Sequence, residues 1–293
     1  MKRTFKHILL SSSIALASIS VLSLPSTTTA APAINIQSVL QQERAWAGMQ
    51  TKRVKVGDIE WAYSEGGTKG KPVIMLIHGL AGSRDNWNRV ARYLTPHYQV
   101  IIPDLPGQGD SKAPNDFDYS IPNLTEKLRR FAEAIQVEKD LHIAGHSMGG
   151  AISLLYAAQY PIDAKSLFLV NSAGVFKSAN TPYLKDPNLL RNFVVAKPGD
   201  FDRLFKIAAQ LPPFIPNELK VEQEKLMISN AANTSKLIEQ LILMSKSFTP
   251  DTFAIAARSI DQPTLIVWGD KDQIINVEAA SELPGLLTHA KEP

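Results

Sequence analysis

The chain has 293 residues, of which 44% are hydrophobic and 20% charged, and it contains no cysteine. This composition is typical of a globular protein and excludes both a thiol nucleophile and a fold that depends on disulfide bonds. The formal net charge is +3, but three of the basic residues lie within the first six positions, and without them the charge falls to zero. The charge therefore indicates no nucleic-acid partner.

Residues 1–30 are typical of a secretory signal peptide. A basic start is followed by an apolar, serine-rich run from Ile8 to Leu24, and the small residues around Ala30 are suited to cleavage. We expect this segment to be removed and the protein to be exported, either to the periplasm or out of the cell. The alternative is an uncleaved membrane anchor, which the many serines of the run disfavour.

Beyond residue 30, strand-like and helix-like segments alternate along the chain. This alternation predicts an α/β fold, in which a mostly parallel, open sheet is flanked by helices. We expect strands at residues 54–56, 59–63, 72–77, 100–102, 141–144, 167–170 and 264–268, and helices between 77 and 100, at 124–135 and at 151–158.

Residues 174–260 contain no convincing strand, whereas apolar residues recur there at helical spacing. This segment is predicted to be an inserted helical cap, with residues 31–173 forming the first part of the core and residues 261–293 the second part.

Ser147 lies at the predicted junction of a strand and a helix, within the sequence GHSMGG at residues 145–150. A sharp turn at this junction would expose the serine at a strained backbone angle, as in a nucleophile elbow. Larger residues at Gly145, Gly149 or Gly150 would collide with the neighbouring strand or helix. The context therefore favours Ser147 as a catalytic nucleophile.

Three further motifs follow predicted strands: HGLAGS at residues 78–83, DLPGQGDS at 104–111 and WGDKD at 268–272. Together with the elbow, and in this order, they resemble the α/β-hydrolase fold family, and within it the capped bacterial lipases and esterases. The resemblance covers nearly all of the chain after residue 30. It implies a serine hydrolase that cleaves carboxylic esters by a Ser-Asp-His mechanism.

Physical chemistry and the resemblance together suggest a role for each site residue. The Met148 N–H, directly after the nucleophile, is expected to stabilise the oxyanion at a helix N-terminus. The resemblance implies that the Leu80 N–H is the second oxyanion donor. It also implies Asp272 as the acid of the triad, in preference to Asp270. His78 is expected to shape its loop, and we expect Asp104 and Asp110 to do the same.

The histidine base is not evident among the six histidines of the sequence. In the resembled family the base follows the acid by a helix, a strand and a loop, often as a Gly-His pair. His289 is the weak remaining candidate, because it falls before the expected last strand. We therefore expect that a C-terminal strand, the catalytic histidine and a closing helix are missing, and that the base lies beyond Pro293.

Two alternative functions remain open at this stage: a carbon–carbon bond hydrolase with the same serine machinery, and an inactive binding protein that lacks its base. We expect no cofactor and no metal, because no His or Cys cluster has ligand spacing. The expected partner is a small ester or lipid substrate, with transient contact with a lipid interface. The acyl chain length and the oligomeric state are not predicted.

Overall fold

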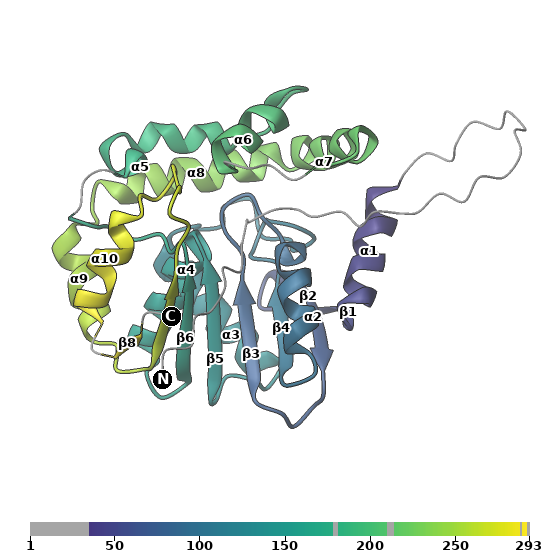
Figure 1. Ribbon diagram of the computed structural model, residues 1–293. Helices are drawn as coiled ribbons and strands as arrows, with labels where there is room; N and C mark the ends of the chain where they lie inside the picture. The colour runs from purple at the N-terminus through teal and green to yellow at the C-terminus, as the bar shows by residue number, and fades with distance from the viewer. Residues whose placement is uncertain (1–34, 178–180, 210–213, 288, 292–293) are drawn as a thin grey trace, which may run out of the picture.

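The computed structural model describes residues 35–177, 181–209, 214–287 and 289–291, so the predicted signal peptide lies outside the described residues. One eight-stranded sheet runs through the molecule in the order β1-β2-β4-β3-β5-β6-β7-β8 (Figure 1). The strands are β1 (Met49–Val56), β2 (Ile59–Gly67), β3 (Val73–Ile77), β4 (Gln99–Pro103), β5 (Leu141–His146), β6 (Ala164–Val170), β7 (Thr264–Val267) and β8 (Ala290–Lys291).

The sheet is parallel from β4 to β8, whereas β1 and β2 form an antiparallel hairpin and β2 pairs antiparallel with β4. Each strand predicted from the sequence overlaps one of these elements, although residues 72 and 268 lie just outside β3 and β7. A tight turn joins β1 to β2, and Gly57 has a φ of +61° there. The α/β fold is therefore as expected.

Helices cover both faces of the sheet, and the alternation of side chains along β3 shows which face each helix covers. Met75 and Ile77 share a buried cluster with residues of α3 (Ile121–Ala134) and α4 (Met148–Gln159). Ile74 and Leu76 point to the other face, where they pack with Ala91 of α2 (Asn88–Leu94). Because successive side chains of a strand face opposite sides, a strand buried on both sides is continuously apolar.

The described residues between β6 and β7 are mainly helical. They form α5 (Pro182–Lys185), η2 (Pro187–Phe193), α6 (Asp200–Ala208), α7 (Asn217–Ser229), α8 (Ala231–Ser245) and α9 (Pro250–Arg258). Helices α5 to α8 lie across one end of the sheet, beyond the ends of its strands, in Figure 1, whereas α9 packs against α4 and α10 (Glu278–Leu286). That residues 174–260 form the cap stays a prediction.

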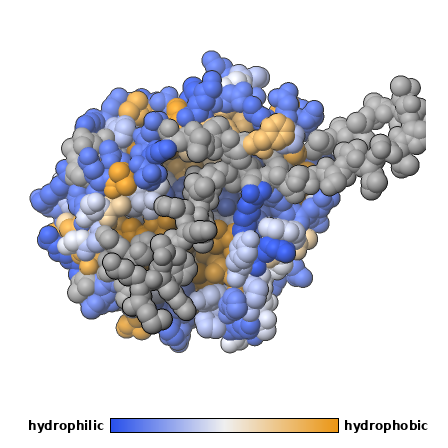
Figure 2. Space-filling model, in the orientation of Figure 1, coloured by the Kyte–Doolittle hydropathy of each residue, from blue (hydrophilic) through white to orange (hydrophobic). Residues whose placement is uncertain are grey.

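The surface in Figure 2 is hydrophilic over most of its rim, and hydrophobic residues gather toward the middle of the view. Large apolar side chains are also exposed on the helical segment, among them Phe214 and Leu243, which are 86% and 61% exposed. In the part of the chain that the structure describes, no helix is both long and apolar enough to cross a bilayer.

The first helix, α1 (Ile36–Trp46), connects the helical segment to the rest of the fold. Ile36 shares a small buried cluster with Phe201 of α6 and Leu219 of α7. Eight residues further along the same helix, Arg44 forms an ion pair with Asp85, with 2.6 Å between Nη2 and Oδ2. Helix α1 therefore contacts both the helices between β6 and β7 and the turn that follows β3.

The expectation that the last strand is missing was wrong in part. Residues 290 and 291 form β8, which pairs in parallel with β7, with Ala290 opposite Thr264. The physical reason is the length of the connection: α10 ends at Leu286, so the chain has already returned to the start of β7 by residue 289. β7 is thus paired at its first two residues and is not a free edge there.

A buried ion pair holds together the loops that follow β3 and β4. Arg84 is 1% exposed and its guanidinium binds Asp104, which is 0% exposed. The same guanidinium reaches Asp110, with 2.6 Å between Nη2 and Oδ2. The Arg84 N–H also donates to Asp104 Oδ1 at 2.6 Å. Asp104 and Asp110 are therefore structural residues of these loops, as predicted.

We predict that Arg84→Met lowers the free energy of unfolding by about 3–5 kcal/mol, because the buried Asp104 carboxylate would lose its cationic partner and keep only hydrogen bonds from the backbone. Urea denaturation of the variant and the unchanged protein would measure this. The control is Arg191→Met, which removes the Arg191–Glu239 pair, whose side chains are 52% and 51% exposed, and should leave the stability nearly unchanged. Equal stability of the two variants would contradict the prediction.

Candidate active site

Ser147 connects β5 to α4 with a strained backbone, at φ 54° and ψ −121°. Non-glycine residues rarely adopt such angles, and they do so only where the surrounding structure holds them. Here the Ser147 N–H donates to the Val170 carbonyl at 3.1 Å, and the Ser147 carbonyl accepts from the Ala173 N–H at 2.9 Å. The segment after β6 therefore holds the elbow in place.

The glycines beside Ser147 are required by close contacts between backbones. A Cβ atom on Gly145 would lie 2.1 Å from the carbonyl oxygen of Gly149, and one on Gly149 would lie 2.3 Å from that of Ile77. Both distances are far shorter than any tolerated carbon–oxygen contact. The steric requirement predicted for these two positions is confirmed.

The two predicted oxyanion donors lie on either side of the elbow. The HGLAGS loop abuts the serine, because a Cβ atom on Gly79 would lie 3.1 Å from the Ser147 Cβ. Within the described residues, the Leu80 N–H that follows donates to no protein acceptor. Met148 is the first residue of α4, where backbone N–H groups lack intrahelical partners.

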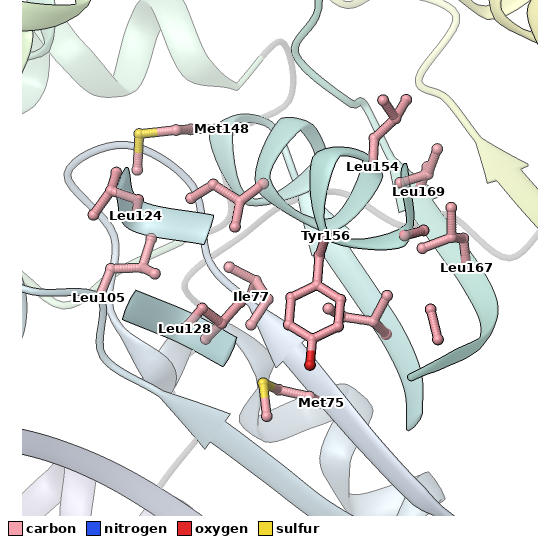
Figure 3. Close-up of a cluster of buried hydrophobic side chains, with 14 of the residues drawn as sticks. Met75, Ile77, Leu105, Leu124, Leu128, Met148, Leu154, Tyr156, Leu167 and Leu169 are labelled. Atoms are coloured by element: carbon pink, nitrogen blue, oxygen red, sulfur yellow. The ribbon is translucent and has the colours of Figure 1, made fainter. Parts of the chain in front are cut away.

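The start of α4 is anchored in the core by the Met148 side chain. This side chain is buried in one cluster with Leu105 and Leu124 (Figure 3). The buried side chain fixes the first turn of the helix, so its N–H groups keep a constant direction. Such preorganised donors stabilise a developing oxyanion without a cost of reorganisation.

His78 shapes the HGLAGS loop, as predicted. The Leu105 N–H donates to Nε2 at 3.0 Å, so the proton of the neutral ring is on Nδ1, which donates to the Gly79 carbonyl at 2.8 Å. Burial lowers the pKa of His78 to about 4. The ring is therefore neutral at pH 7, and both of its nitrogens are engaged by the backbone.

Asp272 lies in the loop after β7, at the same end of the sheet as the elbow. Its Oδ1 accepts hydrogen bonds from the Ile274 and Ile275 N–H groups at 2.8 and 3.0 Å. Its Oδ2 accepts a hydrogen bond from the Asn171 side chain. Asp270, by contrast, is exposed. The structure thus holds Asp272 in a defined orientation, which is the property required of a triad acid.

Asn171 was missed by the sequence analysis. It follows β6 directly and contacts the predicted acid across the end of β7. A signal was present in the sequence, since an amide side chain at the carboxyl end of a parallel strand lies where such folds gather their functional groups.

None of the hydrogen bonds in the described part of the chain joins a histidine to Ser147. His146 lies against the HGLAGS loop, because a Cβ atom added to Gly79 would lie 3.2 Å from His146 Nδ1. His142 contacts Ser166 near the start of β6, with 2.7 Å between Nδ1 and Oγ.

His289, the candidate base, accepts through its carbonyl from the Thr264 N–H at 3.2 Å. Because Thr264 is the first residue of β7, His289 lies at the end of the sheet opposite to Asp272. It is therefore not placed to act on Ser147.

Residues with metal-ligating side chains are scattered. Among the described residues, no group of three or more His, Cys, Asp or Glu side chains is placed to hold a metal ion. The groups brought together at the carboxyl end of the sheet are a hydroxyl, a carboxylate, an amide and free backbone N–H groups. This set is suited to acyl transfer through a serine nucleophile.

Comparisons with known proteins agree with this geometry. The family model described as alpha/beta hydrolase fold matches residues 72–292. Lipase 1 of Psychrobacter immobilis is 34% identical over 283 residues, which cover 94% of this chain and 86% of the relative. The solved structure of lip1 from Acinetobacter baumannii AYE, assigned as a lipase, is 60% identical with a TM-score of 0.87, and covers 88% of this chain and 86% of that one.

A second solved structure, that of a membrane phospholipase A, is 36% identical with a TM-score of 0.81, and the match covers 88% of this chain and 81% of that chain. The family match spans more than half of the chain, and the elbow, the HGLAGS loop and the loop after β7 all fall within it. The chain therefore belongs to the α/β-hydrolase fold family.

Proposed function

We propose that this protein is an exported serine hydrolase that cleaves acyl esters, with Ser147 as its nucleophile. The relatives of this chain include two lipases at 34% identity. They agree with a carboxylic ester hydrolase of the lipase and esterase type. The observation that carries the serine mechanism is the strained Ser147 backbone, held at the start of α4. The Leu80 N–H of the loop beside it donates to no acceptor among the residues that the structure describes.

In the proposed reaction, Ser147 Oγ attacks the ester carbonyl and forms an acyl-enzyme, releasing the alcohol, and water then hydrolyses the acyl-enzyme. The negative charge that develops on the carbonyl oxygen would be bound by the Leu80 and Met148 N–H groups. Asp272 would orient a histidine and stabilise its charged form while that histidine takes the serine proton.

The base must reach the carboxyl end of the sheet, where Ser147 and Asp272 lie. β8 runs parallel to β7, so the position beyond the carboxyl end of β8 lies on this side of the sheet. We propose that the base acts from that position. His289 precedes β8 and is assigned no catalytic role.

Apolar residues around the site support acyl groups as the substrate class. Leu237 and Leu241 of α8 share a buried cluster with Met148, and Leu80 packs against the same cluster. Apolar side chains of α8 and of the HGLAGS loop thus belong to the same cluster as the residue after Ser147, which favours an apolar acyl chain over a polar substrate.

We predict that Ser147→Ala lowers kcat for ester hydrolysis by about 10⁶-fold, since the nucleophile is removed. The assay would use soluble p-nitrophenyl acyl esters, with labelling by an ester-mimicking phosphonate as a second readout. The matched control is Ser166→Ala, because the Ser166 hydroxyl contacts a histidine, His142, at 2.7 Å, as a catalytic serine would, but lies near the opposite end of the sheet.

Retained turnover in Ser147→Ala would contradict the serine mechanism. An unchanged protein whose Ser147 does not react covalently with the phosphonate, and that hydrolyses neither esters nor carbon–carbon substrates, would instead support the binding-protein alternative. Hydrolysis of carbon–carbon substrates in preference to esters would favour the other alternative.

We predict that Asp272→Asn lowers kcat by about 10⁴-fold, because an amide cannot stabilise the charged form of the histidine. The control is Asp270→Asn, which changes an exposed aspartate two residues away and should leave kcat within about two-fold of the unchanged protein. Measuring kcat for both variants on the same ester tests the assignment, and the reverse order of effects would show that Asp270 is the acid.

The proposal that the protein is exported rests on the sequence of residues 1–30, which lie outside the described residues. We predict that the mature protein begins near Ala31, because a signal peptidase would cleave after the small residues there. Mass spectrometry of the protein from the periplasm and the culture medium of an expressing bacterium would identify this N-terminus. A cell-bound protein that still carries residues 1–30 would contradict the proposal.

A further inference from the structure

The backbone of Asn171 is left-handed, and its side-chain amide donates a hydrogen bond to the proposed acid, Asp272. The φ of Asn171 is 45°, a conformation that asparagine tolerates better than most residues. Its N–H donates to the carbonyl of Val267, the last residue of β7, at 2.9 Å. This bond continues the β6–β7 pairing by one residue and brings the side chain across to the loop that carries Asp272.

The hydrogen bonds that Asp272 accepts from described residues leave one acceptor position unused by them. An ionised carboxylate offers about four lone-pair positions, two on each oxygen. Both positions on Oδ1 are used by the Ile274 and Ile275 N–H groups, and one on Oδ2 is used by the Asn171 Nδ2. The remaining position is on Oδ2, and the amide of Asn171 determines its direction.

The segment that carries Asn171 also holds the nucleophile. Val170 and Ala173, on either side of it, form the two hydrogen bonds to the Ser147 backbone at 3.1 and 2.9 Å. A single short segment therefore contacts both Ser147 and Asp272, and a shift of Asn171 would change the position of one relative to the other.

We propose that Asn171 is a positioning residue for the hydrolytic reaction: its amide sets the rotation of the Asp272 carboxylate so that the free position on Oδ2 receives the histidine N–H. This role rests on the proposed function, because it takes Asp272 as the acid. Asn171 acts through Asp272 and does not touch the substrate.

The first test is Asn171→Gly, which removes the amide and accommodates the left-handed backbone without strain. The expected result is a fall in kcat of about ten- to hundred-fold, the effect of losing one hydrogen bond to a charged group, with KM changed less than about two-fold. The matched control is Gln136→Gly, an exposed residue with a φ of 60° outside the site, which should leave kcat unchanged.

The second test is Asn171→Asp, which places a second carboxylate against Asp272. At neutral pH the variant has no donor for Oδ2, and its kcat should fall at least as far as that of Asn171→Gly. As the pH is lowered, the pair takes up a shared proton and the hydrogen bond is restored. The kcat of the variant relative to the unchanged protein at the same pH should therefore rise as the pH falls.

A purely structural role would give a ratio that does not vary with pH, and such a ratio would overturn the proposal. A kcat for Asn171→Gly equal to that of the unchanged protein would also overturn it. If the unchanged protein itself reacts with neither esters nor the phosphonate, the proposed function fails and the positioning role falls with it. If the unchanged protein is active and only the Asn171 expectations fail, the proposed function stands.

Discussion

The strained backbone of Ser147 is the constraint on which the rest of the site depends. A non-glycine residue at φ 54° and ψ −121° is costly, and the residues that hold it are distributed over three strands. Gly145 and Gly149 allow β5, α4 and β3 to approach closely, and the segment after β6 binds the serine backbone from two sides. The strain is therefore balanced by packing in the centre of the sheet.

The HGLAGS loop is made rigid by polar groups that are buried beneath it. The Arg84 guanidinium binds Asp104 and Asp110, and His78 connects the loop to the chain after β4 through Leu105. Ala81 keeps a left-handed φ of 56° while its N–H donates to the Gln108 side chain at 3.0 Å. A loop with this support can keep a backbone N–H free of protein partners, which an oxyanion donor requires.

Helix α1 connects the residues that support the HGLAGS loop to the helices between β6 and β7. Its Arg44 binds Asp85, the neighbour of Arg84, and its Ile36 packs with Phe201 and Leu219 of the cap helices. The helices between β6 and β7, the first helix and the HGLAGS loop are thus joined by one continuous set of packing contacts and ion pairs.

The sequence alone determined the fold class and the strained turn at Ser147, because these depend on local patterns. Continuous apolar runs mark strands that are buried on both faces, and glycines mark places where backbones touch. Ser147 could be selected as a candidate because it directly follows a strand pattern, and Asp272 because it lies in the loop after another. Parallel strands bring such positions to one end of a sheet.

Only the tertiary structure decided which groups meet across strands. The contact between Asn171 and Asp272 joins residues that lie far apart in the chain. It depends on the left-handed backbone of Asn171, which no local pattern predicts. The position of His289 at the opposite end of the sheet likewise follows from the short path through α10, which returns the chain to the start of β7. Spacing along the sequence limits how far a residue can reach, but pairing between strands decides which end of the sheet it occupies.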